Sequence, residues 1–357
     1  MLLSICIPTY NRKESLSNLI GFLEDELCDG VEVVIVDNAS DYLPGNVPTI
    51  RKVLESGKPI RIVRNKSNVG AGANVMRCFE LAEGQWVWIF GDDDIPEKGA
   101  IKKVVSILRA STNVLAYNFA TTILSNQGIS RKEVVEASGI MDFASKVDCF
   151  SNLLFISASI FKKHYMLPHL RSGYYMLGSC APHLAVLLSA IEAGNNSVIF
   201  HPLNIVKWNI DTLGGWKLSV VFPKLRQLFC VIENEQARKL LAIKNSFSHP
   251  MGALSFRWSA RAIKSWVLMD DSIAYHSFLM WTENLAAHTI DYGHVSLRLC
   301  LRFILSLALF WFCRVARCLL LLIAHTFKCK TLRTALNRSS PYSRATHNSS
   351  ILGDSRI

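Results

Sequence analysis

The 357-residue sequence lacks the signals of several common protein classes. Its ten cysteines include no C-x-x-C pair, which argues against a zinc ribbon and against a thioredoxin-like site. No basic region precedes the first apolar run, because the first cation is Arg12, so the N-terminus does not have the form of a secretory signal. No repeat of fixed period is found. We therefore expect a protein of the reducing cytosol whose cysteines act mainly as small core residues.

Composition excludes two further classes and indicates a partner. Hydrophobic residues make up 50% of the chain and charged residues 19%, which is too apolar for a disordered protein and too charged for a polytopic membrane protein. The net charge of +11 is uneven: residues 1–110 hold 13 basic and 15 acidic side chains, whereas residues 111–357 hold 26 and 13. Because no nucleic-acid-binding motif accompanies this basic excess, we expect an anionic membrane surface as a partner and no nucleic acid.

The first hundred residues alternate between expected strands and expected helices. Leucines at helical spacing predict a helix over 16–27, which an Asn11–Glu14 capping box would begin. Two further helices are expected at 72–82 and 99–109. This order predicts an α/β fold with a mostly parallel central sheet, in which ligands bind at the carboxyl ends of the strands. The expected strands are the apolar runs at 2–7, 31–36, 60–64 and 86–90.

Three polar segments follow these strands, at 8–12, 37–40 and 91–94, and we expect them to meet at one edge of the sheet. The last segment contains an acidic triplet, Asp92, Asp93 and Asp94. Crowded carboxylates raise the pKa of at least one member unless a cation is near, and a divalent metal with oxygen ligands would relieve the repulsion. A solvated turn is the alternative, but the position of the triplet directly after an apolar strand disfavours it.

The combination of motifs resembles a known family. The segments are LLSICIPTYNRKESL at 2–16, VEVVIVDNAS at 31–40, the run from RNKSNVG to IFGDDD at 64–94, and IPEKGAI directly after it. In this order they resemble a family 2 glycosyltransferase of GT-A fold, and within that family the bacterial O-antigen sugar transferases of the abequosyltransferase-like kind. The resemblance is strong over 1–110, weaker over 150–210, and ends at about residue 230.

The resemblance implies roles for the matching residues. Asp37 would hold the nucleotide base, Asp93 would lie near the ribose in the catalytic centre, and Asp94 and Asp92 would hold Mg²⁺ or Mn²⁺ on the diphosphate. Many relatives have an aspartate at the position of Gly91. The residues that would contact the nucleotide are Pro8, Tyr10, Asn11, Asp37, Asn38, Ser40, Asn68, Gly70, Asn74 and Asp93.

The general base is a second expectation from the resemblance. The family usually places an Asp or Glu at the start of a helix that reads D-x-x-L-x-L and ends at a glycine eleven residues later. In this chain that position is His183, and Gly194 follows eleven residues later. An imidazole with a pKa of about 6.5 can take a proton at neutral pH, so His183 is expected to be catalytic. A helix-capping or acceptor-binding role is the open alternative, with Asp211 and Glu192 as weaker candidates for the base.

The segment 297–324 is very apolar, yet four arginines interrupt it. Its longest charge-free apolar run, 303–313, is far shorter than the roughly 20 residues that a membrane-spanning helix needs. At helical spacing the arginines occupy less than half of the helix circumference, and large apolar residues occupy the other half. This pattern predicts a basic amphipathic helix that lies in a membrane interface. Packing of the helix on the catalytic domain is the alternative.

These expectations define the whole chain. We expect a GT-A catalytic domain at 1–220, with a nucleotide-binding half at 1–110 and an acceptor half at 111–220. A helical region, a membrane-interface helix and a basic disordered tail would follow at 221–296, 297–325 and 326–357.

The resemblance implies a metal-dependent glycosyltransferase that moves a sugar from a nucleotide-diphosphate sugar to a polyprenyl-diphosphate-linked oligosaccharide. It would act in O-antigen-like surface polysaccharide synthesis, as a peripheral protein on the cytoplasmic face of the bacterial inner membrane. A nucleotidyltransferase and a catalytically inactive membrane-associated scaffold of the same fold are the alternatives.

Overall fold

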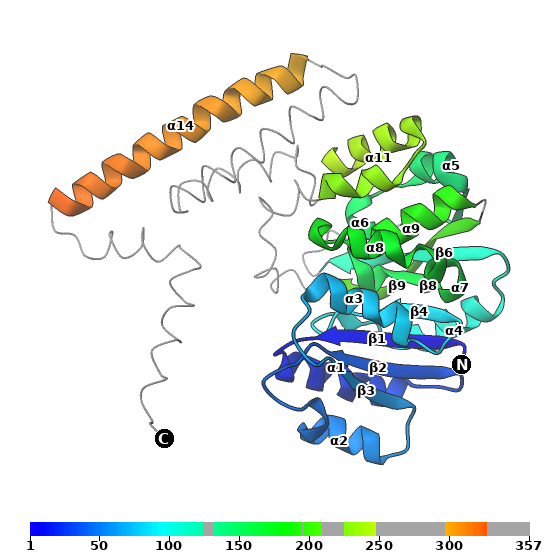
Figure 1. Ribbon diagram of the computed structural model, residues 1–357. Coiled ribbons are helices and arrows are strands. Elements are labelled where there is room, and N and C mark those ends of the chain that lie inside the picture. The colour runs from blue at the N-terminus through cyan, green and yellow to red at the C-terminus, as the bar shows by residue number, and fades with distance from the viewer. Residues whose placement is uncertain (124–130, 195, 209–224, 248–296, 327–357) are drawn as a thin grey trace. The chain divides into compact units, whose positions relative to one another are not determined.

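The computed structural model describes residues 1–123, 131–194, 196–208, 225–247 and 297–326 (Figure 1). The chain divides into two compact units, and each is considered by itself. The first contains Met1–Lys217 and Lys224–His249, and the second contains Leu218–Pro223 and Pro250–Ile357.

Nine strands of the described residues form one sheet in the first unit, in the order β3-β2-β1-β4-β8-β6-β9-β5, with β7 paired to β9. The four strands expected from the sequence are confirmed and are mutually parallel. They are β1 (Leu3–Thr9), β2 (Val31–Asp37), β3 (Ile60–Arg64) and β4 (Trp86–Ile89).

Five further strands were not expected from the sequence. β8 lies between β4 and β6 and is antiparallel to both, whereas β6 and β9 run parallel to each other. The sheet is therefore mostly parallel, as expected, with β5, β7 and β8 running against the other strands. The added strands are β5 (Ile95–Pro96), β6 (Val114–Ile123), β7 (Val135–Ser138), β8 (Ser159–Lys162) and β9 (Ser197–Trp208).

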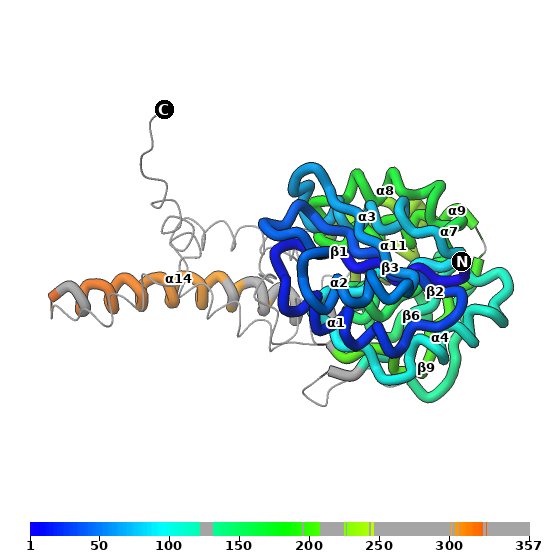
Figure 2. Tube along the Cα trace, turned by 90° about the horizontal axis from the view of Figure 1, so that it is seen from below, coloured from blue at the N-terminus to red at the C-terminus, as the bar shows by residue number. Residues whose placement is uncertain are grey.

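Helices cover both faces of this sheet. One buried cluster joins apolar side chains of α1 (Lys13–Glu26), α2 (Pro48–Glu55) and α4 (Ala100–Arg109) to alternate residues of β1 and β2. α3 (Ala71–Leu81) and α9 (Pro182–Ala193) lie on the opposite side of the strands from α1 and α4 (Figure 2). β1, β2 and β4 are thus buried on both faces, which explains their nearly continuous apolar runs, whereas the edge strand β3 is half-buried.

The expected capping box is wrong, although the helix itself is confirmed. α1 begins after Arg12, which makes no side-chain capping bond. Asn11 has a positive φ of 54° and pairs with Asp41 instead: its Nδ2 donates to the Asp41 carboxylate and its Oδ1 accepts from the Asp41 N–H, both at 2.8 Å. A tertiary contact between the ends of β1 and β2 therefore replaces the local capping pattern.

Short helices complete the first unit, and the second unit contributes one long helix, α14 (Leu297–Thr326). None of the helices in the described ranges is long and apolar enough to cross a membrane. η6 and α11 fall within the expected helical region 221–296, whereas 248–296 and the expected tail from 327 lie outside the described residues. The remaining elements are η1 (Pro44–Asn46), α5 (Gly139–Lys146), α6 (Phe150–Leu154), η2 (Ile156–Ala158), α7 (Lys163–Met166), η3 (Leu167–His169), α8 (Leu170–Tyr175), η4 (Leu177–Ser179), η6 (Arg226–Val231) and α11 (Glu235–Phe247).

Candidate functional site

The three polar segments that follow β1, β2 and β4 meet at one edge of the sheet, as the strand order predicted. Thr9 at the end of β1 donates from Oγ1 to Asp92 Oδ2 at 2.7 Å. The backbone N–H of Asn38 donates to the Thr9 carbonyl at 2.9 Å, and the N–H of Asn11 donates to Ser40 Oγ at 2.9 Å. The parallel register of β1 with both neighbours makes this convergence possible.

The acidic triplet is strongly perturbed. Burial of the carboxyl group, together with the charge of Asp93, raises the pKa of Asp92 to about 6. Burial and the charges of Asp93 and Asp92 raise the pKa of Asp94 to about 8. Mutual repulsion in a poorly solvated turn has the consequence expected from the sequence: these groups gain stability from a proton or from a nearby cation.

One such cation is already present in the chain. Arg12, which follows β1, forms an ion pair with Asp93 and lies 3.4 Å from Asp92 Oδ1 through its Nη1 atom. Its side chain is 42% exposed, so the pair lies at the mouth of the site. Arg12 was not among the site residues expected from the sequence. Its place in the polar segment 8–12, directly after Asn11, is the sequence feature that could have indicated a role in the site.

Asp94 is held from another part of the sheet. Its Oδ2 accepts a hydrogen bond of 2.5 Å from Ser157 Oγ in η2. Within the described part of the chain, Oδ1 of Asp94 accepts no hydrogen bond. Beside the triplet is a cavity of about 330 Å³, which α1 and the start of β5 also line, and a volume of this size is within the range of ligand pockets.

Asp37 ends β2 and is 0% exposed. Its Oδ1 accepts from Ser40 Oγ at 2.5 Å and its Oδ2 accepts from Arg64 Nη1 at 2.7 Å. Arg64 also donates to the carbonyls of Ser40 and Tyr42, and it thereby fixes the whole turn after β2. In this structure Asp37 organises the turn, and Arg64, which the sequence analysis missed, completes it.

Four asparagines build the next turn. Asn38 Nδ2 donates to Asn68 Oδ1 at 2.7 Å, and Asn68 Oδ1 also accepts the Gly70 N–H at 2.9 Å. Asn65 joins Asn38 to Asn74 through its Nδ2, and Asn74 in turn donates to the Val36 carbonyl at 2.9 Å. Gly70 precedes α3 with a φ of 85°, a backbone conformation that side-chain-bearing residues rarely adopt.

The residues predicted to contact the nucleotide thus differ in accessibility. Tyr10 is 42% exposed, and Asn11, Asn68 and Gly70 are also exposed. Pro8 is half-buried. The buried members Asp37, Asn38, Ser40 and Asn74 hold the exposed ones in place through the contacts above.

His183 does not face an open site. It is 3% exposed at the start of α9, and its Nε2 lies 3.2 Å from the Leu153 carbonyl. Burial lowers the pKa of His183 to about 4, so the imidazole is neutral at pH 7 and is a weak base. This geometry disfavours the expected general base and favours a structural role at the helix start, because an acceptor hydroxyl cannot reach a buried ring.

Of the two weaker candidates for the base, the structure describes Glu192 but not Asp211. Glu192, near the end of α9, accepts the Asn234 N–H through Oε1 at 2.9 Å, which ties α9 to the segment before α11. Asp211 lies outside the described residues.

Comparison with known proteins agrees with this architecture. Residues 4–161 match the model of the family described as glycosyl transferase family 2. Over 117 residues the chain is 34% identical to abequosyltransferase RfbV of Salmonella typhimurium, an alignment that covers 32% of this chain and 34% of that protein. Over 134 residues it is 30% identical to an uncharacterized glycosyltransferase of Haemophilus influenzae, covering 36% of this chain and 42% of that protein. The matches therefore span about two fifths or less of these curated relatives.

Solved structures extend the likeness in fold. The chain is similar to S. aureus TarS with a TM-score of 0.52 at 14% identity, over 82% of this chain and 89% of that chain. A structure of the same protein in complex with UDP-GlcNAc has a TM-score of 0.53 at 13% identity, over the same shares of the two chains. Residues 4–161, with their clustered strand ends, thus match glycosyl transferase family 2, and the chain shares the GT-A fold of these structures.

Proposed function

We propose that the protein transfers a sugar from a nucleoside-diphosphate sugar to a hydroxyl group of a lipid-linked oligosaccharide, in the synthesis of an O-antigen-like surface polysaccharide. The observation that carries the proposal is the acidic triplet at the end of β4, beside the ends of β1 and β2, within a family 2 domain. Identity to an abequosyltransferase over a third of the chain supports the polysaccharide class.

The chemistry of the triplet fits a divalent cation. Among the residues that the structure describes, no three His, Cys, Asp or Glu side chains form a metal cage. Mg²⁺ in nucleotide sites usually takes only one or two carboxylates and fills its other positions with phosphate oxygens and water. Asp94 and Asp92 offer such a pair, because both have raised pKa values that a cation would lower. Mg²⁺ or Mn²⁺, when bound there, supplies positive charge for the departing diphosphate.

The residues of the chain perform the rest of the proposed donor binding. Tyr10 and Asn11 offer exposed side chains for the nucleotide at the end of β1, beside the turn after β2 that Asp37 and Arg64 keep rigid. Arg12 already contacts Asp92 and Asp93, so its guanidinium is available to a phosphate oxygen once a metal takes over the carboxylates. Asp93 is more exposed than Asp92, and we assign its carboxylate to the ribose.

α14 is the proposed attachment to the membrane. Its side chains at the apolar half are exposed, whereas Arg314 and Arg317 are buried. A helix with a broad exposed apolar face and no capacity to span is suited to lie along a bilayer surface. The location that we propose is the cytoplasmic face of the bacterial inner membrane, where a polyprenyl-diphosphate acceptor would be presented. The exposed large apolar side chains are Leu301, Ile304, Leu305, Leu307, Trp311, Phe312, Val315, Leu319, Leu320, Leu322 and Ile323, each at least 37% exposed.

Donor turnover tests the proposed activity. Purified protein is incubated with a panel of nucleotide sugars and Mn²⁺, and the release of nucleoside diphosphate is measured. Asp94→Ala should reduce this turnover by about 10²-fold or more, because it removes a carboxylate from the charged centre. Asp142→Ala, which removes an aspartate from the surface of α5, should retain activity.

The products distinguish the alternatives. A nucleotidyltransferase would release pyrophosphate, and an inactive scaffold would release neither product with any donor. Metal-independent turnover in the presence of a chelator, or an Asp94→Ala variant with full activity, would contradict the assignment of the triplet.

A further inference from the structure

We propose that Ser157, together with Gly91, is the positioning device that makes Asp94 a one-oxygen ligand for the divalent cation. Ser157 is buried in η2 and would not touch donor or metal. The inference rests on the proposed function, since it concerns how the cation site of that function is formed.

The first observation is the hydrogen bonding of Ser157, which is 0% exposed. Its Oγ accepts the Gly91 N–H at 2.8 Å and donates to Asp94 Oδ2 at 2.5 Å. A serine hydroxyl has one proton, and no described group other than Asp94 accepts it. Oδ2 of Asp94 is therefore engaged, and Oδ1 is the oxygen left for a cation.

The second observation is the space around Gly91. A Cβ atom built on Gly91 would lie 2.5 Å from Asp94 Oδ2 and 3.2 Å from Asp94 Cγ. The Asp94 N–H also donates to the Gly91 carbonyl at 3.2 Å, which closes a tight turn over the triplet. A side chain at position 91 would require the Asp94 carboxylate to shift from the position in which it reaches Ser157. Gly91 is thus matched to Ser157.

The third observation is that Ser157 itself cannot move freely. Its carbonyl accepts a hydrogen bond of 2.8 Å from Trp88 Nε1, and Trp88 is buried in β4. The strand that leads into the triplet therefore also holds η2. Two hydrogen bonds, from Trp88 Nε1 and from the Gly91 N–H, therefore hold Ser157 against the end of β4.

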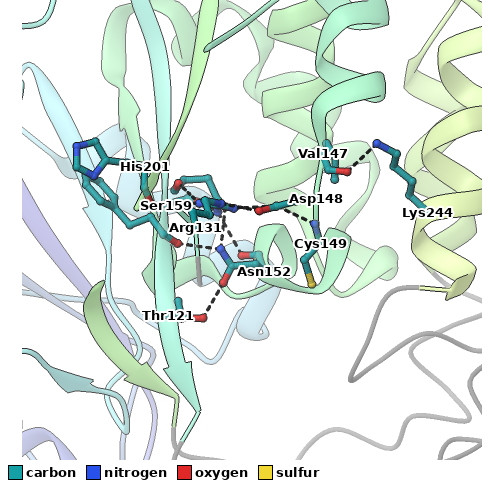
Figure 3. A network of polar contacts seen from close by, with 11 residues as sticks. Thr121, Arg131, Val147, Asp148, Cys149, Asn152, Ser159, His201 and Lys244 are labelled. Atoms are coloured by element: carbon teal, nitrogen blue, oxygen red, sulfur yellow. Dashed lines mark hydrogen bonds and ion pairs between the residues drawn. The ribbon is translucent and has the colours of Figure 1, made fainter. Parts of the chain in front are cut away.

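A polar network anchors the segment before η2 to the sheet (Figure 3). Asn152 of α6 donates from Nδ2 to Asn118 Oδ1 and to the Phe119 carbonyl, both at 2.8 Å, and its Oδ1 accepts from Thr121 Oγ1 at 2.9 Å. Every one of these contacts joins α6 to β6. Because Asn152 is five residues before Ser157, the hydroxyl is presented by a segment with little freedom to shift.

Mn²⁺ binding tests the inference without relying on activity. The protein is titrated with Mn²⁺, alone and with UDP, GDP, CDP or dTDP, and free Mn²⁺ is followed by electron paramagnetic resonance. Ser157→Ala should weaken Mn²⁺ binding by about 10–100-fold, as the loss of a group that orients a metal ligand usually does. Nucleotide binding without metal should not change. Ser159→Ala removes an equally buried hydroxyl that accepts from Asn118 and does not contact Asp94, so its Mn²⁺ affinity should remain that of the parent.

A double-substitution cycle separates positioning from general damage. Gly91→Ala should displace the same carboxylate from the opposite side and weaken Mn²⁺ binding to a similar extent. Each substitution alone releases the Asp94 carboxylate from its position, so the second one has no further effect on it. The double variant Gly91→Ala with Ser157→Ala should therefore bind Mn²⁺ about as well as either single variant. Additive losses would show two independent structural defects and would overturn the inference.

The outcomes keep the two proposals apart. If the parent protein binds no Mn²⁺ with any of these nucleotides, the proposed metal-dependent function fails and this inference fails with it. If the parent binds Mn²⁺ and Ser157→Ala binds it equally well, the positioning role is refuted and the function stands. If a thermal denaturation curve shows that Ser157→Ala is not folded at the temperature of the titration, the Gly91→Ala variant, which changes a partly exposed turn, is titrated with Mn²⁺ instead. Unchanged Mn²⁺ affinity of Gly91→Ala would then refute the positioning role.

Discussion

At the scale of single residues, His183 illustrates how an environment overrides a sequence pattern. Its position matches the register of a base-bearing helix, but its ring is enclosed between α9 and the Leu153 carbonyl. Desolvation makes the charged imidazolium costly, so the folded state keeps the ring neutral down to a pKa of about 4. Burial of His183 should therefore affect the stability of the fold rather than the rate of sugar transfer.

His183 should make the fold sensitive to acid. Between about pH 6.5 and pH 4 the unfolded chain binds a proton at this histidine and the folded protein does not, so the free energy of unfolding falls as the pH drops through that window. His183→Gln removes the titration, and its thermal midpoint should decline less than that of the parent between pH 7 and pH 4.5. His164→Gln, at an exposed histidine, should follow the parent curve more closely. Parallel curves for His183→Gln and the parent would contradict the burial argument.

Asp94 should destabilise the metal-free fold at alkaline pH. Its pKa is raised from 3.8 to about 8, so the folded protein retains a proton in this range that the unfolded chain has released. The free energy of unfolding therefore falls as the pH rises from about 4 to about 8. In the presence of a chelator, Asp94→Asn should be more stable than the parent at pH 8 by about 1 kcal/mol or more, or about 2–4 °C in Tm. The advantage should shrink at pH 5; an equal difference at both pH values would show that another group is responsible.

The sequence revealed some site residues and not others for a physical reason. The acidic triplet is three consecutive letters after an apolar strand, so its crowding is visible without a structure. Ser157 lies 63 positions from Asp94, and Arg64 lies 27 positions from Asp37. Such contacts depend on the order of strands in the sheet, which a single sequence does not specify. Burial of His183 likewise depends on neighbours that its own helix does not reveal.

At the scale of elements, the same contrast separates the two halves of the sheet. β1, β2 and β4 are short apolar runs buried on both faces, so they can be recognised in the sequence, and β3 is a half-buried run at the edge of the sheet. β6 contains Asn118 and Thr121, both buried, which interrupt the apolar pattern. They are tolerated because Asn152 and Ser159 satisfy them, and the unpaired groups would otherwise be costly.

The Arg131–Asp148 pair should stabilise this second half. Arg131 is 5% exposed and binds both oxygens of Asp148, at 2.7 and 3.0 Å, while its Nη2 also donates to Asn118 Oδ1 at 2.7 Å (Figure 3). Burial alone would raise the pKa of Asp148, but the guanidinium holds it below its ordinary value. Arg131→Lys keeps the charge and loses the planar fork, so it should lower the free energy of unfolding by about 1–3 kcal/mol.

Denaturant unfolding of paired variants measures this contribution. The exposed Asp142–Lys146 pair of α5 is the natural control, and Lys146→Ala should cost no more than about 0.5 kcal/mol. Arg131→Lys with a loss as small as the control would show that the guanidinium of Arg131 does not stabilise this half of the sheet.

At the scale of the whole molecule, the chain combines a mostly parallel sheet with a helix of different character. In the first unit most large apolar side chains are buried and the exposed ones come from many separate elements, whereas α14 alone exposes eleven. Exposed apolar area of this extent on one helix is unusual in a protein that remains in water, and it is typical of interaction surfaces. The spacing predicted an apolar half of this helix, and most of the exposed side chains belong to it, but Leu320 lies on the predicted basic half and Arg314 and Arg317 are buried.

Vesicle binding tests the role of this face. The full chain should sediment with vesicles of phosphatidylethanolamine containing about 30% phosphatidylglycerol, less with neutral vesicles, and less at high salt, since each basic residue near the surface contributes about 1 kcal/mol. Leu305→Asp with Phe312→Asp should abolish sedimentation, because each change replaces about 1.5–3 kcal/mol of apolar burial with a charge. Leu43→Asp, at an exposed leucine of the first unit, should sediment like the parent. Donor turnover in detergent-free buffer should be equal for all three proteins, since α14 supplies none of the donor-binding residues.

Equal sedimentation of the α14 variant and the parent would refute membrane docking through this face. A vesicle-independent dimer that the α14 variant disrupts would assign the face to a second copy of the chain.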